Sequence, residues 1–398
     1  MADISLMTRN DFPILKKAVY LDSAATSLCP EPVLEKTLEY YREFKANIHR
    51  GSHSLTERAS REYESVYRKL ARFFNAKPNS FIHTKNASEA INLVALGLEW
   101  GKGANVVTTV VEHHSNLLPW MRLKDRKIIS ELRFVEPLDA EGGFDIDDFK
   151  EQIDSDTRLV AVTGASNVLG NRVRVVQEII KAAHAEGALV LLDAAQMVGI
   201  MPVDFKRLGV DFAAFSGHKM LAPMGTGCLY HNVKGFQSPL LGGGMIKSVS
   251  REKYVLMPSP QGGEAGTPNI SGVIGLGAAV DYLSKAGLKR IEAHEQELAG
   301  MMIDGLRDLP GVEVYGPLDS REKTGLVSFN LKGIPTHEVA IMADELARVC
   351  IRSGHHCAMP LHEFLGVAGS VRASVHCYNN EADVETFLGV VRRINALK

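Results

Sequence analysis

DFAAFSGHK, residues 211–219, is a short apolar run followed by a turn and a lysine. Residues 212–215 predict a buried strand, and Ser216-Gly217 is typical of the turn that ends one. A lysine at the end of a core strand loses part of its water, which lowers the pKa of its amine. Lys219 is therefore a candidate nucleophile and base of the kind that forms a Schiff base. A solvated loop lysine is the alternative, and this segment alone favours it.

Two other segments carry groups that complement this lysine. ALVLLD (188–193) predicts a second buried strand, which ends at Asp193. A carboxylate there can keep the ring nitrogen of pyridoxal phosphate protonated, so that the ring accepts electrons. RSGHHC (352–357) places the thiol of Cys357 in a turn beside cationic groups, which favour a thiolate. The acid, the lysine and the thiol together form a candidate active site.

Short apolar strands alternate with helices between residues 81 and 216. This pattern predicts an α/β fold with a mostly parallel sheet that helices cover on both faces. Ligands of such sheets bind at the carboxyl ends of the strands, where Asp193, Asn167 and Lys219 are expected. The expected strands are 81–84, 105–111, 131–135, 159–163, 188–193 and 212–215, and the expected helices are 31–48, 55–74, 87–98, 116–124, 146–153 and 175–186.

The segment 239–268 is rich in Gly, Pro and Ser and is expected to be a loop and a domain junction. Beyond it the pattern becomes α+β, which predicts a second, smaller domain. Its expected helices are 272–286, 288–309, 336–346, 361–365 and 381–397, and its expected strands are 312–316, 326–331, 347–353 and 370–378.

Composition narrows the class of protein. A chain of 398 residues is long enough for two or three domains, and a formal net charge of −2 gives no electrostatic case for nucleic acid or an anionic membrane as a partner. The N-terminus lacks the apolar core of a signal peptide, and the most apolar stretch, 187–203, is broken by Asp193 and Gln196. Five cysteines at irregular spacing do not form a disulfide framework, so a reducing cytoplasm is expected.

A series of motifs in one order resembles those of the Suf-type (group II) cysteine desulfurases and selenocysteine lyases, which are pyridoxal-phosphate enzymes of the class V aminotransferase family. The motifs are LDSAAT (21–26), HRGSHSLTERA (49–59), SEAIN (88–92), EHHSN (112–116), SNVLG (166–170), DAAQ (193–196), SGHK (216–219), EAGTPN (264–269) and RSGHHCAMP (352–360).

The resemblance implies fold type I of the pyridoxal-phosphate enzymes, with a large domain built on a mostly parallel seven-stranded sheet and a smaller α+β C-terminal domain. It implies an N-terminal segment, 1–20, that packs on the small domain, a cofactor-binding domain, 21–265, and a small domain, 266–398, that carries the catalytic cysteine. It also implies a homodimer with cofactor sites near the subunit interface.

The resemblance assigns the cofactor's phosphate to a helix N-terminus at Ala87 and Ser88, together with Ser216 and His218. Free amides and a hydroxyl at such a terminus suit an anion, although Ser88 as a simple helix cap is the alternative. Relatives have a second hydroxyl where this chain has Ala87. Thr267 matches a phosphate ligand that reaches across from the other subunit. Gly262 and Gly263 stand where relatives have an aromatic and a basic residue, and we expect this difference to loosen the loop that carries Thr267.

Other residues match groups around the cofactor ring. By resemblance, His113 stacks on the ring and shuttles protons, Asn167 and Gln196 bind its phenolic oxygen, and Asp193 pairs with its nitrogen. A structural histidine is the alternative for His113, and a turn residue is the alternative for Asn167.

The substrate residues are also implied by resemblance. Cys357 is the sulfur acceptor, Arg372 clamps the substrate carboxylate, and Arg352 and Asn167 lie beside the substrate. A small buried apolar residue is the alternative for Cys357, and a solvated or salt-bridged arginine is the alternative for either arginine. No metal ligand is expected.

The implied reaction removes sulfur from L-cysteine, giving L-alanine and a Cys357 persulfide that passes to a Suf-type acceptor protein. Selenocysteine lyase activity is the nearest alternative. A metal-binding or sulfur-carrier module built from His113, His114, His355, His356 and Cys357 is more remote, because their spacing is no standard zinc pattern. The tether between Arg352 and Cys357 is too short to carry the sulfur far.

Overall fold

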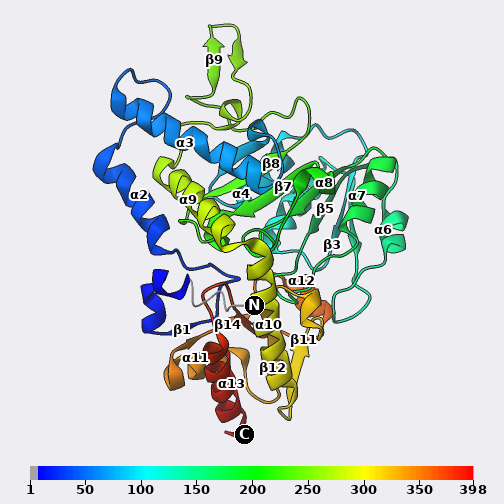
Figure 1. The fold of residues 1–398 in the computed structure, drawn as a ribbon. Coiled ribbons are helices and arrows are strands. Elements are labelled where there is room, and N and C mark those ends of the chain that lie inside the picture. The colour runs from blue at the N-terminus through cyan, green and yellow to red at the C-terminus, as the bar shows by residue number, and fades with distance from the viewer. Residues whose placement is uncertain (1–7, 398) are drawn as a thin grey trace.

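A seven-stranded sheet forms the centre of the computed structural model, which describes residues 8–397 (Figure 1). The strand order is β2-β8-β7-β6-β5-β3-β4, and every neighbouring pair is parallel except the two that β8 makes. The predicted α/β fold with a mostly parallel sheet is therefore confirmed. The strands are β2 (Phe81–Thr84), β3 (Asn105–Thr109), β4 (Glu131–Val135), β5 (Thr157–Thr163), β6 (Leu189–Asp193), β7 (Phe212–Ser216) and β8 (Gly227–His231).

Helices cover both faces of this sheet because its strands are apolar on both sides. Val106 and Leu159 belong to one buried cluster, and their chain neighbours Val107 and Val160 belong to another. Successive side chains of a strand point to opposite faces, so the two clusters lie on opposite sides of the sheet. α4 (Ala87–Gly97) and α5 (Leu118–Asp125) contribute to the first cluster; α2 (Glu31–Glu43), α3 (Ser54–Phe73), α6 (Ile146–Gln152), α7 (Val176–Ala185), α8 (Phe205–Leu208) and α9 (Ile270–Ala286) contribute to the second.

The strand order reverses beside β3. The chain passes outward from β3 to β4 and then returns to the other side of β3 as β5. In open parallel sheets, ligands bind in the crevice that such a reversal leaves at the carboxyl ends of the strands. The loops that follow β3, β5, β6 and β7 all leave the sheet at this edge, which makes it the place to look for an active site.

A second, four-stranded antiparallel sheet lies in the C-terminal part, in the order β11-β12-β15-β14. It packs with α10, α11 and α13 around a separate apolar cluster, at the lower end of the molecule in Figure 1. The bounds are β11 (Val312–Tyr315), β12 (Leu326–Leu331), β14 (Arg352–Gly354), β15 (Ser370–Ser374), α10 (Leu288–Arg307), α11 (Thr336–Ala347), α12 (Met359–Phe364) and α13 (Glu381–Asn395).

The expected strand 347–353 is divided in two. Its first half forms β13 (Val349–Cys350), which pairs with β1 (Val19–Tyr20) in a parallel two-stranded sheet, whereas Arg352 begins β14 of the larger sheet. The sequence shows one apolar run, and only the tertiary partners show that the run changes sheets after Cys350.

The described part of the N-terminal segment packs on the C-terminal part of the chain. Arg9 forms an ion pair with Asp383, with 2.7 Å between Nη1 and Oδ2, and the ring of Phe12 lies 4.7 Å from that of Tyr378. β1 adds the pairing with β13. Residues 1–7 of the expected segment 1–20 lie outside the described residues.

The expected loop 239–268 contains a hairpin, so that part of the expectation is wrong. β9 (Ile246–Val249) and β10 (Tyr254–Leu256) pair antiparallel and project from the top of the molecule in Figure 1. Both strands are short and are flanked by Gly, Ser and Pro. These turn-forming residues dominate the composition of the segment and hide the strands in the sequence. The hairpin exposes Val249, Tyr254 and Val255.

The segment after the hairpin is tightly packed around Glu264. Its carboxylate accepts hydrogen bonds from the hydroxyls of Tyr63 (2.7 Å) and Tyr67 (2.6 Å) and from the backbone N–H of His83 (2.7 Å). Gly262 and Gly263 are buried, and a Cβ at either would lie only 1.9 Å from Met257 O or 2.6 Å from Ile82 Cδ1. The glycines therefore allow close packing, in contrast to the expected loosening of this loop.

We expect Glu264→Gln to lower the free energy of unfolding by about 1–3 kcal/mol, because an amide offers one acceptor oxygen where the carboxylate offers two and turns a donor toward a buried donor. Urea unfolding measures the change. Glu136→Gln, at an exposed position, is the matched control and should change stability by less than about 0.5 kcal/mol. Equal effects of the two substitutions would show that Glu264 does not hold the segment.

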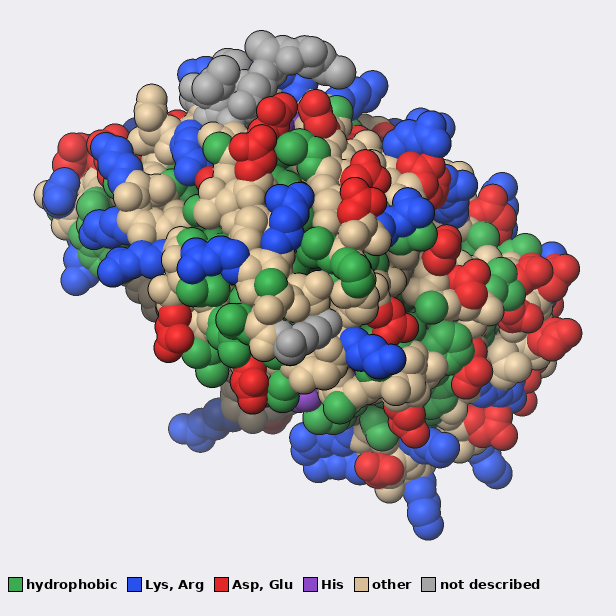
Figure 2. All heavy atoms as spheres, turned by 90° about the horizontal axis from the view of Figure 1, so that it is seen from below, with side chains coloured by type: hydrophobic (Ala, Val, Ile, Leu, Met, Phe, Trp, Pro, Cys, Tyr) green, Lys and Arg blue, Asp and Glu red, His purple; other side chains and the backbone are tan. Residues whose placement is uncertain are grey.

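The surface seen from the lower end of the molecule carries both signs of charge, interspersed rather than separated (Figure 2). Within residues 8–397, no helix has the length and apolar character needed to cross a membrane.

Candidate active site

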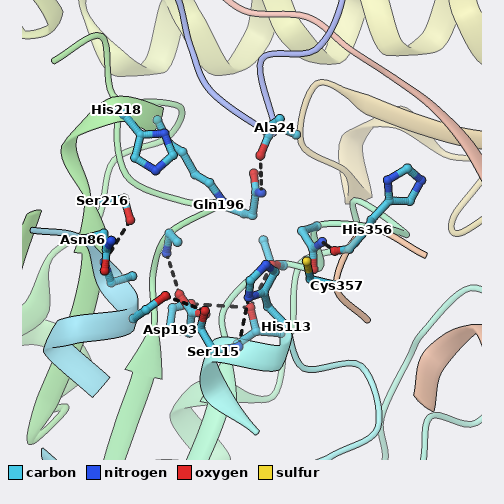
Figure 3. Close-up of a pocket in the computed structure, with 18 of the residues that line it drawn as sticks. Ala24, Asn86, His113, Ser115, Asp193, Gln196, Ser216, His218, His356 and Cys357 are labelled. Carbon is cyan, nitrogen blue, oxygen red and sulfur yellow. Dashed lines mark hydrogen bonds between the residues drawn. The ribbon is translucent and has the colours of Figure 1, made fainter. Parts of the chain in front are cut away.

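A cavity of about 220 Å³ lies at the carboxyl edge of the large sheet. Figure 3 shows Cys357 on one side of it, Asn86 and Ser216 on the other, and Asp193 and His113 between them. The cavity contains every residue that the resemblance assigns to the cofactor or the substrate except Thr267. Its lining residues are Ala24, Ala25, Asn86, Ala87, Ser88, His113, Ser115, Thr163, Ala165, Asn167, Asp193, Ala195, Gln196, Ser216, His218, Lys219, Arg352, His356, Cys357 and Arg372.

Lys219 and Asp193 are positioned by neighbouring strands. β6 ends at Asp193, and β7 ends at Ser216, one turn before Lys219. Burial lowers the pKa of Lys219 to about 8, and the carboxylate of Asp193 opposes part of that shift. Burial raises the pKa of Asp193, while the backbone N–H of Ala195 (3.0 Å from Oδ1) and Lys219 stabilise its charged form. Lys219 is therefore partly shielded from water at the end of a core strand.

The N-terminus of α4 forms one end of the cavity. Asn86 caps this helix by accepting the N–H of Glu89 at 2.9 Å, so Ser88 is not its capping residue. Ser88 instead shares a hydrogen bond of 2.6 Å with Ser115, and the N–H of Ala87 donates to the hydroxyl of Ser216 at 2.9 Å. The hydroxyls of Ser88 and Ser216 and a helix N-terminus thus converge at this end.

His113 follows β3 and forms one wall. Its Nδ1 accepts the N–H of Ser115 at 3.1 Å, which places the ring proton on Nε2. Burial lowers the pKa of His113 to about 3, with Lys219 adding to the shift, so the imidazole is neutral at physiological pH. Neutral His113 therefore offers an N–H donor and a flat ring face to the cavity.

Two polar side chains of the cavity contact a loop from the N-terminal part of the chain. The amide of Gln196 donates to the carbonyl of Ala24 at 2.9 Å. His218 lies 3.2 Å from the hydroxyl of Thr26, and burial lowers the pKa of His218 to about 4. The loop 22–27 therefore closes one side of the site, which explains why LDSAAT accompanies the other motifs.

Arg372 lines the cavity, and 2% of its surface is exposed. It donates to the carbonyl of Asn167 at 2.8 Å and to the carboxylate of Asp22 at 3.2 Å, whereas its buried Nε has no partner among residues 8–397. Arg352 is half exposed and approaches the other oxygen of Asp22 at 3.9 Å. Sequence reasoning missed Asp22 as the counter-charge, although it lies in a motif that we quoted.

Cys357 lies in a turn between β14 and α12. Its carbonyl accepts the N–H of His114 at 2.7 Å, and the amide of Asn167 donates to the carbonyl of His356 at 2.7 Å. Burial lowers the pKa of His356 to about 2, so this neighbour is neutral at physiological pH rather than cationic. The positive charges that share the cavity with the thiol are those of Arg352, Arg372 and protonated Lys219.

Thr267, expected to bind the cofactor's phosphate, lies outside this cavity. It is exposed and lines a second hollow with Asn47, His49 and Arg50, where the amide of Asn47 lies 3.5 Å from its hydroxyl. Among the described residues, no group of three or more His, Cys, Asp or Glu side chains could hold a metal ion.

The residues of the cavity fit pyridoxal phosphate. A phosphate needs N–H and hydroxyl donors, which α4 and its serines supply at one end. A pyridine nitrogen needs a buried acid, and Oδ2 of Asp193 has no hydrogen-bond partner among residues 8–397. An aldehyde needs an amine that is partly unprotonated at neutral pH, which Lys219 provides.

Comparisons with known proteins agree with this fit. The family model described as aminotransferase class-V matches residues 19–387. A probable cysteine desulfurase from Pyrococcus abyssi is 45% identical over 97% of this chain and 96% of its own length.

Two solved structures also match over nearly their whole length. One is the apo structure of a cysteine desulfurase from Thermococcus onnurineus, with 43% identity, a TM-score of 0.94 and coverage of 99% of this chain and 98% of that one. The other is the cysteine desulfurase CsdA (S-sulfonic acid) from Escherichia coli, with 33% identity, a TM-score of 0.91 and coverage of 100% and 99%. The protein belongs to the class V aminotransferase family, whose members depend on pyridoxal phosphate and share fold type I.

Proposed function

We propose that the protein is a cysteine desulfurase, which converts L-cysteine to L-alanine and leaves the sulfur on Cys357 as a persulfide. The observation that carries this proposal is that Lys219, with its lowered pKa, and the Cys357 thiol line one cavity together with a buried carboxylate. The cysteine desulfurases that the chain resembles over nearly its whole length support the same reaction.

The cavity suggests which residues hold the cofactor. The N-terminus of α4 with Ser88, Ser216 and His218 would hold the phosphate, and Asp193 the ring nitrogen. Gln196 and Asn167 would face the phenolic oxygen, and His113 the ring. When bound, pyridoxal phosphate supplies an electron sink that stabilises negative charge at the substrate's Cα.

Lys219 would move the protons of the reaction. With a pKa of about 8, Nζ is partly free at neutral pH and can take the Cα proton of the substrate. The same amine, now protonated, can return a proton to the carbon skeleton of the product. Arg372 would hold the substrate carboxylate, because guanidinium and carboxylate form bidentate pairs and its Nε is buried without a partner.

Cys357 would receive the sulfur. Its thiolate attacks the sulfur of the substrate, the S–S bond forms, and the C–S bond breaks with its electron pair left on the carbon skeleton. Arg352, Arg372 and Lys219 line the same cavity as this thiol. This step needs the thiol close to the substrate sulfur, which the shared cavity allows.

The partner proteins are part of the proposal. Thr267 is exposed and lies outside its own chain's cavity, which supports a homodimer in which the partner subunit's Thr267 completes the phosphate site. A Suf-type acceptor would take the persulfide sulfur at the mouth of the cavity. All five cysteines are free, which supports a location in the reducing cytoplasm.

We expect a burst of one alanine per Cys357 when L-cysteine is mixed with the enzyme, followed by slow turnover. The turn that carries Cys357 is tied by hydrogen bonds to the large sheet's loops, so an acceptor must come to the sulfur. Rapid-quench measurement of alanine tests this, with and without a thiol reductant. The reductant should raise the steady rate and leave the burst unchanged.

Sulfur-free controls show whether the burst comes from the proposed chemistry. L-Serine should give no burst, because it offers no sulfur to Cys357. Failure to release any alanine from L-cysteine would refute the proposed function, whereas alanine release without a burst would refute only the limit on persulfide clearance.

A further inference from the structure

The turn that carries the thiol has an unusual backbone. His356 and Cys357 have φ values of 48° and 58°, so two successive residues with side chains adopt the left-handed conformation. Such residues cost free energy and persist only where surrounding contacts hold them. The position of the Cys357 sulfur therefore depends on whatever holds this turn in place.

His114 contacts the turn on both sides of Ala358. Its backbone N–H donates to the carbonyl of Cys357 at 2.7 Å, and its ring Nε2 accepts the N–H of Met359 at 3.1 Å. Met359 begins α12, where a helix has N–H groups without partners of its own, so the ring serves the helix as a cap from another part of the chain. The neighbouring residue His113 lines the cavity itself. The ring of His114 instead contacts the end of the turn that carries Cys357.

The ring of His114 acts as an acceptor only when it is neutral. Burial lowers its pKa and the facing His355 adds to that shift, with 5.7 Å between the two ring centroids. His113, whose ring centroid is 6.4 Å away, also lies against it. His355 in turn accepts the N–H of Cys357 on its Nδ1 at 3.1 Å. The two imidazoles thus hold the turn from opposite ends.

We propose that His114 is a positioning residue for the Cys357 sulfur. The acceptor nitrogen of its ring binds the N–H of Met359 and so holds the turn that carries the sulfur. The proposal rests on the proposed function in one respect, since it takes Cys357 as the sulfur acceptor. It assigns to His114 an effect on the transfer of sulfur to Cys357 and none on the proton transfer at Lys219. The backbone hydrogen bond of His114 survives any substitution except by proline, so the ring contact can be tested alone.

Two amide variants separate the acceptor from the bulk of the side chain. His114→Gln can place Oε1 where Nε2 lies and accept the N–H of Met359, whereas the shorter His114→Asn cannot reach it. Circular dichroism and thermal melting first establish that both variants are folded and load cofactor like the wild type.

The first measurement needs no substrate. Iodoacetamide modifies Cys357 at a rate that depends on how the turn is held, and peptide mass spectrometry reads that rate beside Cys29 and Cys350, which are also partly exposed. We expect the rate at Cys357 to change roughly 3- to 10-fold in His114→Asn, as loss of one hydrogen bond implies, and to stay near the wild-type rate in His114→Gln. Rates at Cys29 and Cys350 should not change.

The second measurement follows persulfide formation on Cys357 in a single turnover of L-cysteine. We expect His114→Asn to slow it roughly 3- to 10-fold, with His114→Gln close to wild type. Exchange of the Cα proton of L-alanine with deuterated water, which uses Lys219 and not Cys357, should be equal in all three proteins. General damage to the site would slow this exchange, whereas loss of the His114 contact alone would not.

The outcomes are distinct. If the Gln and Asn variants behave alike, either both like wild type or both impaired, the acceptor nitrogen does not hold the turn and the proposal is overturned. If proton exchange falls together with persulfide formation, His114 supports the whole site and the assignment to Cys357 is overturned. If the wild type forms no persulfide, the proposed function fails, and the alkylation rates still decide whether His114 holds the turn.

Discussion

Lys219→Ala loses turnover of every amino acid, by a factor that we expect to be about 10⁴ or more. The substitution removes the amine that reacts with the cofactor's aldehyde and also the base for the Cα proton, and a positioned base alone contributes about 10²–10⁴-fold. The lowered pKa explains why this lysine suits both tasks. At neutral pH a lysine with a pKa of about 8 has roughly 300 times more free amine than an ordinary lysine with a pKa of 10.5. Alanine release from L-cysteine measures the loss.

Two controls separate chemistry from binding. Lys219→Arg keeps a positive charge and should be as inactive as the alanine variant, because guanidinium is neither a nucleophile nor a base. Both variants should still retain cofactor after gel filtration, since the contacts at α4 remain. Loading of cofactor-free wild type should speed up as pH rises through about 8, where Nζ loses its proton. Activity in either variant within tenfold of wild type would refute the role of Lys219.

The fold was predictable where local pattern and tertiary role agree. The expected strands at the centre of the large sheet, such as 159–163 and 188–193, are apolar runs, as burial on both faces requires, and the expected bounds of β2 and β4 match those of the structure. No bounds were expected for β8, which lies buried between β2 and β7. Its run, Gly227–His231, begins with glycine and ends with histidine, so its neighbours in the sheet identify it as a strand better than its own residues do.

The helix expected over residues 31–48 ends earlier, at Glu43, for a similar reason. Phe44 continues the apolar spacing and is fully buried, but it packs from a loop. Spacing alone shows that a side chain reaches the core, and it does not show whether a helix carries that side chain there.

The candidate site was predictable where function follows from a strand end. Lys219, Asp193 and His113 lie at or just after the carboxyl ends of parallel strands, and the end of a strand can be recognised in a sequence. Asp22 could not be found in the same way. Its partner Arg372 is 350 residues away along the chain, and only folding brings the two within 3.2 Å. The contact between His114 and the turn of Cys357 also joins distant segments, 245 residues apart along the chain.

Cys357→Ala loses desulfuration of L-cysteine by about a thousandfold or more, as loss of an enzyme nucleophile does, but keeps appreciable release of alanine from L-selenocysteine. The physical reason is the leaving atom. Selenium departs from carbon more readily than sulfur, so the selenium substrate depends less on a thiolate to draw the atom away. Sulfur needs that attack, and Cys357 is the one cysteine that lines the cavity. Alanine release from the two substrates, compared in one variant, measures the difference.

Cys350→Ala is the matched control, because Cys350 is also partly exposed and lies outside the cavity, and it should leave both activities unchanged. Exchange of the Cα proton of L-alanine should survive in Cys357→Ala, since Lys219 remains, which would place the defect after proton removal. Equal losses on the sulfur and selenium substrates would mean that Cys357 supports the site as a whole rather than taking the sulfur. That result would contradict the proposed division of work between Lys219, which moves protons, and Cys357, which takes sulfur.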